Sequence, residues 1–470
     1  MQAGYYDHAR PEVLELIPTS ARRVLEVGCG SGALGAALKQ RQECYVAGME
    51  FDGDAAATAR EVLDYVRCGD AETSQLPKEI IGERFDCLVC ADVLEHLHDP
   101  EEFLRYALKH WCTPDCTIVL SLPNARHWTI IARLLDGNFG YEDAGLLDRT
   151  HLRFFTRREA EMLLWRAGFD LPQVQAVVDP AYAKWEARGR PRQVTAGGNS
   201  FTVATAADAE ELFVYQWLLT AKHREQQPQV SIIIPVWNQL SCTQECLATL
   251  AQTTDPERTQ IIVVDNGSDD GTCEWLEAWR GENRVVCRFS ENRGFAAACN
   301  AGLREATGEV QILLNNDTHL TPGWLERLCE PLLSDEQAGA AGPVSNYVSG
   351  PQQVATNCQR PDQVDGFAWE WMKANAGAAV EVGRLVGFCL ALRQAAVAEI
   401  GLLDERFGIG TYEDDDYCRR LQQAGYKLLI APGSFVWHYG NRTFAGNGLS
   451  MEAIQAENGK LFAEKWEATK

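Results

Sequence analysis

Residues 312–318 read ILLNNDT, and this stretch ends in side chains that could do chemistry. Its apolar run indicates a buried strand, whose polar end should emerge at the carboxyl edge of a sheet, where open α/β sheets hold their ligands. Asp317 is the single carboxylate there, and Asn315 and Asn316 add amide oxygens. Oxygen ligands of this kind suit a divalent cation. Asp317 is therefore either half of a metal site or the cap of the next helix, and several residues separate it from the helix predicted near Pro322.

The stretch YEDDD holds a second group, four successive acids that should open a helix. On a helix, Glu413, Asp416 and Arg420 share a face through their spacing of three and four residues. Asp414 and Asp415 point in other directions, so we expect Asp416 and Arg420 to form a supporting ion pair. Crowded acids raise one another's pKa values, which suits a general base that works near neutral pH. A solvated acidic start of a helix would have the same composition.

A glycine-rich turn in VLEVGCGSGALG is the third group. Gly28, Gly30 and Gly32 follow a strand predicted at 24–27 and precede a helix. Glycine lets backbone amides approach a ligand closely, and the N-terminus of a helix favours negative charge. Glu50 ends the next strand about 20 residues later, where an acid can hold two ribose hydroxyls. Turns of this kind serve several nucleotide cofactors and also occur as plain tight turns.

The elements that position these groups alternate between strand and helix patterns throughout the 470 residues, which predicts α/β domains with parallel sheets. A polar segment, KHREQQPQ, interrupts this alternation and has a proline next to its last residue. We therefore predict a first domain at 1–224, a linker at 225–229 and a second domain at 230–470. Each domain is long enough to bury its own core.

The composition excludes several classes of partner. The hydrophobic content is 46% and the charged content 23%, as in ordinary globular proteins. A formal net charge of −23 excludes a nucleic-acid surface and leaves at most a peripheral contact with a membrane. The 16 cysteines lie in apolar segments, which favours core thiols in a reducing cytoplasm. A phosphorylated ligand would need a cation, arginines or aimed backbone amides to bind such an acidic chain.

The series of strand ends in the first half resembles the class I S-adenosylmethionine-dependent methyltransferases. The segments VLEVGCGSGALG, CYVAGMEFD, GDAET and FDCLVCADVLEHLHDP carry this resemblance, which extends over about residues 1–220. It implies that Glu50 holds the ribose of the cofactor S-adenosyl-L-methionine, that Asp70 and Ala71 lie by its adenine, and that Asp92 to His96 closes the pocket. The cofactor-binding residues it implies are Glu26, Gly28, Gly30, Gly32, Glu50, Asp70, Ala71 and Asp92.

Methyl transfer to a hydroxyl profits from a general base with a pKa near neutrality, and histidine is the natural candidate. His96, His127 and His151 each follow a predicted strand or lie in GLLDRTHLRFFT, a segment that resembles methyltransferases of bacterial surface-polysaccharide gene sets. We select His151 as the catalytic residue, because its neighbours Asp148 and Arg149 could fix its tautomer. Each of these histidines could instead be a hydrogen-bonded structural residue.

The second half closely resembles the family 2 glycosyltransferases of the GT-A fold, and in particular members similar to O-antigen rhamnosyltransferases. Six motifs occur in the family's order between about residues 228 and 450, including VSIIIPVWN, QIIVVDNGSDDGT, ILLNNDT, GTYEDDD and SFVWHYG. The family's metal motif D-x-D reads Asn315, Asn316 and Asp317 here, so its first carboxylate is missing. The resemblance implies that Asp317 and His438 hold Mg²⁺ or Mn²⁺.

The same resemblance assigns the remaining roles. Asp414 is the catalytic base and Glu413, beside it, binds the acceptor. Asp265 accepts a hydrogen bond from the nucleotide base, which Pro235 and Trp237 frame. The full set of donor-binding residues is Pro235, Trp237, Asp265, Arg293, Gly294 and Asn316. The expected reaction is transfer of a sugar from a nucleotide diphosphate donor with inversion at the anomeric carbon.

The sequence therefore predicts a bifunctional enzyme of bacterial surface-polysaccharide biosynthesis, which methylates a glycan hydroxyl and transfers a sugar such as rhamnose. Its partners would be a nucleotide-diphosphate sugar and a glycan or lipid-linked glycan acceptor, and a lipid-linked acceptor would bring it to the inner membrane face. In a second interpretation the first half is a non-catalytic module that binds cofactor or glycan. A dinucleotide-dependent oxidoreductase, the third interpretation, depends on the glycine-rich turn alone.

Overall fold

The computed structural model describes residues 9–196, 198–224, 228–358, 360, 363–440, 442 and 450–467. The chain divides into two compact units, Met1–Glu225 and Gln226–Lys470. Residues 225–227 of the predicted linker lie outside the described residues. The fold class is α/β in both units, as predicted.

The first unit is built on a seven-stranded sheet with the strand order β3-β2-β1-β4-β5-β9-β6. Strands β1 to β5 are parallel, and β9 pairs antiparallel with both β5 and β6. The strands are β1 Arg23–Val27, β2 Tyr45–Glu50, β3 Tyr65–Cys68, β4 Phe85–Ala91, β5 Cys112–Pro123, β6 Gln173–Val178 and β9 Val214–Lys222. The strand order reverses beside β1, so the crevice at the carboxyl ends of β1 and β4 is the place where such a sheet binds a ligand.

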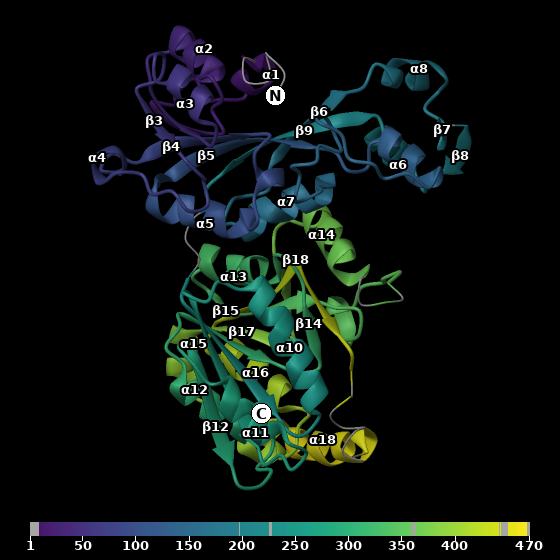
Figure 1. The fold of residues 1–470 in the computed structure, drawn as a ribbon. Coiled ribbons are helices and arrows are strands. Elements are labelled where there is room, and N and C mark those ends of the chain that lie inside the picture. The colour runs from purple at the N-terminus through teal and green to yellow at the C-terminus, as the bar shows by residue number, and fades with distance from the viewer. Residues whose placement is uncertain are drawn as a thin grey trace. The chain divides into compact units, whose positions relative to one another are not determined.

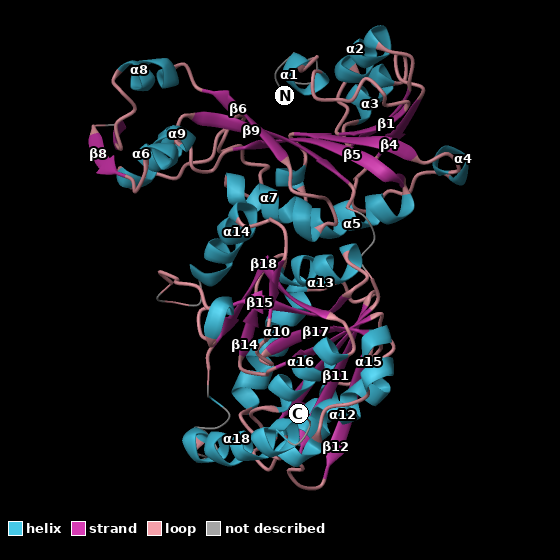
Figure 2. Ribbon diagram, turned by 180° about the vertical axis from the view of Figure 1, so that it is seen from behind, coloured by secondary structure: helices cyan, strands magenta, loops and turns pink. Residues whose placement is uncertain are grey.

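Helices cover both faces of this sheet. Figures 1 and 2 show α2 and α3 on one face and α5 and α7 on the other. The helical elements are α1 Pro11–Leu14, α2 Ala33–Arg41, α3 Gly53–Ala59, α4 Lys78–Ile81, η1 Leu94–His96, α5 Pro100–His110, α6 Trp128–Leu135, α7 Arg157–Arg166, α8 Ala181–Ala187 and α9 Ala206–Glu211. A separate hairpin pairs β7 Gln193–Ala196 with β8 Asn199–Thr202.

The second unit contains a nine-stranded mixed sheet with the order β12-β11-β10-β13-β17-β15-β18-β14, and β16 pairs with β18. Strands β10 to β13 are parallel, whereas β17 joins them antiparallel. The strands are β10 Val230–Val236, β11 Thr259–Asn266, β12 Arg284–Phe289, β13 Val310–Leu314, β14 Thr318–Leu320, β15 Ala338–Val344, β16 Val380–Val382, β17 Cys389–Arg393 and β18 Lys427–His438.

Alternation along β10 explains why this sheet has a core on each face. Ile232 and Ile234 pack in one cluster with residues of α10 and α13, whereas Ile233 packs in another with residues of α12 and α16. The helical elements are α10 Leu240–Thr253, α11 Thr272–Trp279, α12 Phe295–Glu305, α13 Trp324–Ser334, η2 Gly350–Gln352, α14 Val364–Ala374, α15 Gln394–Ile400, η4 Glu405–Phe407, α16 Glu413–Gln423 and α18 Met451–Glu467.

The last helix, α18, packs on its own unit. Its Asn458 donates to the carbonyls of Phe407 and Gly410, both at 2.7 Å, and its Trp466 donates to Asp416 at 3.0 Å. Among the helices of the described residues, none is long and apolar enough to cross a membrane.

Candidate active sites

The second unit has a cavity of about 820 Å³ to which β10, β11, β18, the segment after β13 and the start of α16 contribute residues. Carboxyl ends of parallel strands and the N-terminus of a helix meet here, as expected for a site that binds an anionic ligand. The predicted site residues that line it are Pro235, Trp237, Asn316, Asp317, Glu413, Asp414 and His438.

Strand pairing brings Asp317 and His438 together. β14 and β18 are antiparallel neighbours in which Thr318 lies opposite His438, so Asp317, directly before β14, lies near the same imidazole. The distance between Asp317 Oδ1 and His438 Nε2 is 3.2 Å. The backbone amide of Arg442 donates to the other oxygen, Oδ2, at 3.4 Å. Asp317 is 4% exposed, so its charge is largely removed from water.

The environment of His438 identifies which ring nitrogen is available. Its Nδ1 lies 2.9 Å from the carbonyl oxygen of Tyr347, which requires the proton on Nδ1. Phe388 stacks on the ring at a centroid distance of 5.0 Å. Nε2 is buried and has no hydrogen-bond partner among the described residues. Nε2 lies 3.2 Å from a carboxylate oxygen of Asp317, and a divalent cation bound by these two atoms would satisfy both.

The two asparagines before Asp317 differ in their contacts. Asn316 donates to Thr243 Oγ1 at 3.0 Å, which fixes its amide in a buried position. Asn315 lines the cavity, and its Oδ1 is buried without a hydrogen-bond partner in the described part of the chain. Asn315 therefore presents a free acceptor beside Asp317, although the missing D-x-D carboxylate would have stood at this position.

The acids at the start of α16 are held in different ways. Asp414 accepts from the backbone amides of Gly387 at 2.8 Å and Asp415 at 2.9 Å. Asp415 pairs with Arg384 at 2.5 Å. Burial, followed by the charge of Asp414, raises the pKa of Asp415 to about 6. Asp414 is therefore oriented toward the cavity by backbone groups rather than neutralised by an arginine.

Asp416 is fully buried and forms the supporting ion pair that the spacing predicts. Its carboxylate lies 3.0 Å from Arg420 and 2.6 Å from Lys465. Glu413 is the opposite case, because its Oε2 is buried and has no hydrogen-bond partner among the residues described. Burial, together with the charge of Asp414, raises the pKa of Glu413 to about 8. Glu413 therefore holds a proton at neutral pH.

Three predicted donor-binding residues do not line the cavity. Asp265 is buried and accepts from the Ser268 amide at 3.0 Å, and its Oδ2 is unpaired within the described ranges, 3.8 Å from Arg288. Arg293 places its guanidinium 4.7 Å from the centre of the Phe289 ring.

Gly294 has a packing reason to be glycine. Its φ is 94°, and a Cβ there would lie 2.2 Å from the carbonyl oxygen of Gly408. The family resemblance counts this glycine among the donor-binding residues. The space beside Gly294 is filled by backbone, so packing already excludes a side chain.

Arg384, Tyr347 and Gly387 line the same cavity but were not selected from the sequence. Arg384 supplies a cation beside α16, and Gly387 supplies the amide that holds Asp414. A single arginine or glycine in a loop has no periodicity or spacing that would have indicated these roles.

In the first unit, Glu50 organises the glycine-rich turn. Its Oε2 accepts from the Gly30 amide at 2.8 Å and its Oε1 accepts from the Asp52 amide at 2.9 Å. Gly28, Gly30 and Gly32 all have positive φ, between 52° and 83°. Glu26 lies beneath the turn, where burial raises its pKa to about 8 and its Oε2 has no partner in the described structure.

The other predicted cofactor residues lie at the ends of the neighbouring strands. Asp70, beside Ala71, accepts from the Glu72 amide at 2.9 Å. Asp92 follows β4 with a φ of 55° and accepts from Ser121 Oγ at 2.9 Å. The guanidinium of Arg10 forms an ion pair with Asp92.

His151 has different partners from those predicted. Asp148 accepts from the Thr150 amide at 2.8 Å and from its hydroxyl at 2.7 Å, and Arg149 pairs with Asp143 at 2.6 Å. Among the described residues, no hydrogen bond joins either of these side chains to the imidazole of His151, which is hydrogen-bonded to the backbone of Leu146. The nearest acid is Glu95, whose Oε1 lies 4.0 Å from His151 Nε2.

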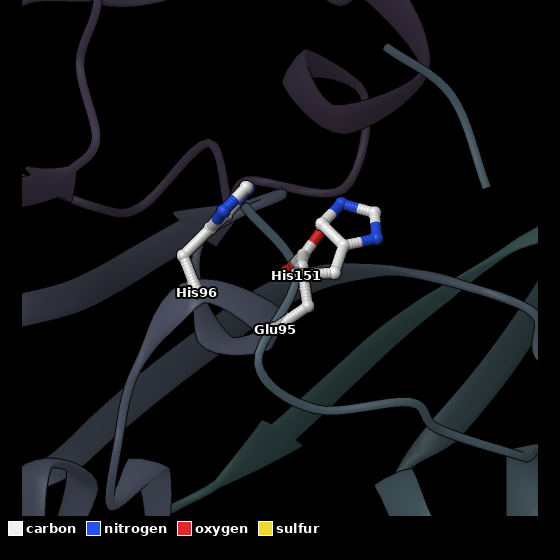
Figure 3. A group of neighbouring side chains, drawn as sticks. All are labelled: Glu95, His96 and His151. Atoms are coloured by element: carbon white, nitrogen blue, oxygen red, sulfur yellow. The ribbon is translucent and has the colours of Figure 1, made fainter. Parts of the chain in front are cut away.

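Figure 3 shows the carboxylate of Glu95 near the rings of His96 and His151. Burial lowers the pKa of His151, and the charge of His96 lowers it further. Burial raises the pKa of Glu95 well above its usual value. The third candidate, His127, caps α6 by accepting from the Thr129 amide and lies 3.6 Å from Asp179, so it has a structural role.

Comparison with known proteins identifies both units. Residues 231–396 match the family model of "Glycosyl transferase family 2". Residues 2–174 match the family model of a "Methyltransferase domain". The chain therefore combines an N-terminal methyltransferase domain with a C-terminal domain of glycosyl transferase family 2.

Two curated relatives each match about two fifths of the chain. Glycosyltransferase AglE of Haloferax volcanii is 29% identical over 208 residues, which cover 43% of this chain and 64% of the relative. The N-acetylglucosaminyl-diphospho-decaprenol L-rhamnosyltransferase of Mycobacterium tuberculosis is 29% identical over 218 residues, covering 41% of this chain and 70% of the relative. The chain spans less than two thirds of the length of the first relatives it matches, from 23% to 64%.

Similar solved structures cover about half of the chain each. The mannosyltransferase PcManGT from Pyrobaculum calidifontis, in complex with GDP-Man and Mn²⁺, has a TM-score of 0.35 and 21% identity, and covers 47% of this chain and 60% of its own. A SAM-dependent methyltransferase from Archaeoglobus fulgidus has a TM-score of 0.32 and 19% identity, and covers 45% of this chain and 91% of its own.

Proposed function

We propose that this chain, which joins a methyltransferase domain to a family 2 glycosyl transferase domain, is a bifunctional enzyme that transfers a sugar to a glycan and methylates a glycan hydroxyl. The observation that carries the proposal is the buried Nε2 of His438, which lies 3.2 Å from Asp317 Oδ1 in the large cavity. Such a pair of acceptors suits a divalent cation, and a cation suits a substrate with a diphosphate.

Asp317 and His438 would hold Mg²⁺ or Mn²⁺, with the amide oxygen of Asn315 beside them. When bound, the ion would neutralise charge on the departing nucleotide diphosphate. This help is needed in a chain whose formal net charge is −23, because its acids otherwise repel a diphosphate. Pro235 and Trp237 line the same cavity and would frame the nucleotide base. Asp265 lies on the neighbouring strand, opposite Val236.

Asp414 is the proposed base for sugar transfer. Its carboxylate would take the proton of the acceptor hydroxyl as that oxygen attacks the anomeric carbon and the nucleotide diphosphate leaves from the opposite side, which inverts the configuration. The amides of Gly387 and Asp415 hold this carboxylate in place. Glu413, protonated at neutral pH, can donate to a hydroxyl or phosphate oxygen of a bound ligand.

The first unit would bind S-adenosyl-L-methionine beside Gly28, Gly30 and Gly32, with Glu50 at its ribose and Asp70 and Ala71 by its adenine. His151 lies on the acceptor side, next to Glu95 and His96. Joining the two activities in one chain raises the concentration of one site's product near the other site. We infer that both act on the same glycan.

A screen of nucleotide sugars tests the donor site. Protection of the full chain against thermal unfolding is measured with each nucleotide sugar, with and without Mn²⁺, and hydrolysis of the donor is followed in parallel. The panel includes a nucleotide-diphosphate rhamnose, because one relative is an L-rhamnosyltransferase, and it also includes GDP and UDP sugars. We expect one donor class to protect the chain in a Mn²⁺-dependent way, and a chain that no donor protects would contradict the proposal.

The acceptor panel contains both free glycans and lipid-linked glycans. A lipid-linked acceptor would require peripheral contact with the inner membrane face, so transfer is measured with acceptor in detergent and in vesicles. Transfer to free glycans alone would limit the proposal to a soluble acceptor.

A second candidate function, a first unit that binds but does not methylate, is favoured by the ion pair between Arg10 and Asp92. In this ion pair Arg10 occupies Asp92, the acid that should close the cofactor pocket. Binding of S-adenosylmethionine without methyl transfer to any glycan in the panel would favour this candidate. Methyl transfer at any turnover would exclude it.

A further inference from the structure

The cluster of Glu95, His96 and His151 in the first unit has the composition of a metal site. Each residue offers a ligand atom, and these atoms lie within 4.8 Å of one another. Glu95 and His96 belong to η1, directly after β4, and His151 lies on the irregular segment before α7. Figure 3 shows the three side chains converging from these two segments.

The carboxylate of Glu95 needs a partner that the described residues do not supply. Glu95 is 1% exposed, and neither of its oxygens accepts a hydrogen bond within the described ranges. Burying an unpaired carboxylate is costly unless a cation or a proton compensates it. The nearest positively charged candidate, His151 Nε2, is 4.0 Å from Oε1, which is too far for a hydrogen bond.

Both imidazoles are oriented by backbone carbonyl oxygens. His96 Nδ1 lies 3.2 Å from the carbonyl oxygen of Thr150, so the proton belongs on Nδ1 and the lone pair on Nε2. His151 is hydrogen-bonded to the backbone of Leu146, and its centroid lies 4.9 Å from that of His96. A ligating histidine characteristically donates its other N–H to such an oxygen, which fixes the tautomer.

Backbone contacts hold the cluster together and place it by the glycine-rich turn. The carbonyl oxygen of Glu95 accepts from the amides of Leu152 at 2.8 Å and Arg153 at 3.0 Å, which ties the loop of His151 to η1. Val93, two residues before Glu95, packs so closely on Gly28 that a Cβ there would lie 2.4 Å from its Cγ2. The cluster therefore lies where an acceptor would meet the cofactor.

We propose that Glu95, His96 and His151 bind one divalent transition-metal ion, which holds the sugar hydroxyl that is methylated. Two imidazoles and one carboxylate suit Mn²⁺, Fe²⁺, Co²⁺ or Zn²⁺, whereas Mg²⁺ and Ca²⁺ prefer oxygen ligands alone. Three protein ligands leave positions for the hydroxyl oxygens of a sugar. This role of the ion rests on the proposed methyl transfer, whereas the binding of the ion does not.

The proposed methyl transfer needs only the bound hydroxyl, S-adenosylmethionine and water. A hydroxyl bound to a divalent cation loses its proton to water more readily than a free one. The resulting oxygen attacks the methyl carbon of S-adenosylmethionine, so a C–O bond forms, the C–S bond breaks and the sulfonium becomes a neutral thioether. In this reaction His151 acts as a ligand, in place of the general base predicted from the sequence.

Mn²⁺ binding to the full chain tests the site. The variant Asp317→Ala/His438→Ala provides the background, because it removes the ligands proposed in the second unit. Free Mn²⁺ is measured by electron paramagnetic resonance during a titration, and folding is checked by circular dichroism. We expect one Mn²⁺ per chain in this background, and about 100-fold weaker binding or none after a further Glu95→Gln substitution. His98→Ala is the matched control, because His98 is a nearby, exposed histidine paired with Glu72; it should bind Mn²⁺ unchanged.

A second measurement identifies the ligand atoms directly. Electron spin-echo modulation of the bound Mn²⁺ in the background variant should show coupling to two ¹⁴N nuclei, and His96→Ala should reduce this to one. Absence of Mn²⁺ binding, binding that Glu95→Gln leaves unchanged, or absence of ¹⁴N coupling would each overturn the metal site.

Methyl transfer provides the readout for the ion's role. Mn²⁺ binding with both ¹⁴N couplings in a chain that methylates no glycan would support the metal site and refute the proposed methyl transfer. Methyl transfer that proceeds at full rate after removal of the ion would overturn the role of the ion in holding the hydroxyl.

Discussion

Each of the two units contains a carboxylate that faces an imidazole, but different elements bring the two groups together. In the second unit, Asp317 and His438 come from paired strands, and the register of β14 and β18 sets their distance of 3.2 Å. In the first unit, Glu95 and His96 are adjacent in one short turn, and an irregular loop brings His151 to 4.0 Å from Glu95. Strand register is more constrained than loop conformation, so the first arrangement could be anticipated from motif order and the second could not.

The two sites also differ in what surrounds them. Asp317 and His438 open into a cavity of about 820 Å³ with further acids and amides, which can hold a large donor. Glu95 is buried under its own loop, with only His96 and His151 as candidate co-ligands among the described residues. We therefore expect substitutions at one site to leave the chemistry of the other intact.

The largest effect is expected from Asp317→Ala. Sugar transfer should fall by about 10³-fold, because several kcal/mol of charge stabilisation at the leaving group are lost. Transfer is measured with a radiolabelled nucleotide sugar, and chelation of divalent ions should reproduce the loss in the wild type. Asp365→Ala is the matched control, since Asp365 pairs with His319 at 3.0 Å and does not line the cavity. Equal loss in both variants would refute the assignment of Asp317.

Asp414→Asn should be the next most damaging change. Sugar transfer should fall by about 10²-fold or more, because an amide cannot accept the proton of the acceptor hydroxyl. Donor protection against unfolding should persist, since donor binding does not need this proton transfer. Asp415→Asn serves as the comparison and should cost far less, because Asp415 is already paired with Arg384. A larger loss in Asp415→Asn would move the base to that residue.

Much of this arrangement could be predicted from the sequence, and the exceptions share a physical cause. Strand ends such as Glu50 and Asp317 were found because parallel strands place their carboxyl ends at one edge. The sequence suggested Asp148 as the partner of the His151 ring because the two residues are close in the chain. On an irregular loop, closeness in the chain does not determine which side chains are in contact. The Arg10–Asp92 pair joins residues 82 positions apart and has no local signal.

Backbone contacts between segments far apart in the chain could not be predicted from the sequence either. Gly294 stands against Gly408, and the sequence offered only its position before a helix. The cores, in contrast, follow directly from alternation, since Ile232 and Ile233 face opposite clusters in a strand that reads as continuously apolar. Fold class was therefore accessible from the pattern, whereas the contacts between loops were not.

Stability against pH should sharpen the comparison, because each unit has one buried glutamate with a pKa raised to about 8. Folded Glu26 and Glu413 keep a proton that the unfolded chain releases at a pKa of 4.5. The stabilisation that each protonated glutamate gives the folded chain is fully present below the unfolded pKa. It is lost as the pH rises toward 8, and the free energy of unfolding falls by about 1.4 kcal/mol per pH unit for each group.

Glu26→Gln and Glu413→Gln test this pH dependence. Each variant should lose part of the decline in unfolding free energy between pH 5 and 8, measured by denaturant titration of the transition of its own unit. Glu15→Gln, at an exposed acid of the first unit, is the control and should keep the wild-type slope. A wild-type slope in both buried-site variants would contradict the protonated state of these glutamates.

The smallest effects are expected from two glycines. Gly28→Ala would place a Cβ 2.4 Å from a Val93 methyl group, and Gly294→Ala would place one 2.2 Å from the Gly408 carbonyl oxygen. Both have positive φ, which costs about 1–3 kcal/mol for a side chain. Gly294→Ala should be the more destabilising, because backbone yields less easily than a side chain. Thermal unfolding measures the difference, and the reverse order would refute this explanation.

One measurement tests the central claim, that a single chain carries two separable transferase sites. Wild type, Asp317→Ala and Glu95→Gln are each incubated with the selected sugar nucleotide, labelled S-adenosylmethionine and the glycan acceptor, and both products are quantified by mass spectrometry. We predict that Asp317→Ala loses sugar transfer and keeps methyl transfer to an already extended acceptor, whereas Glu95→Gln shows the reverse. Loss of both products in both variants, or of neither, would contradict the claim.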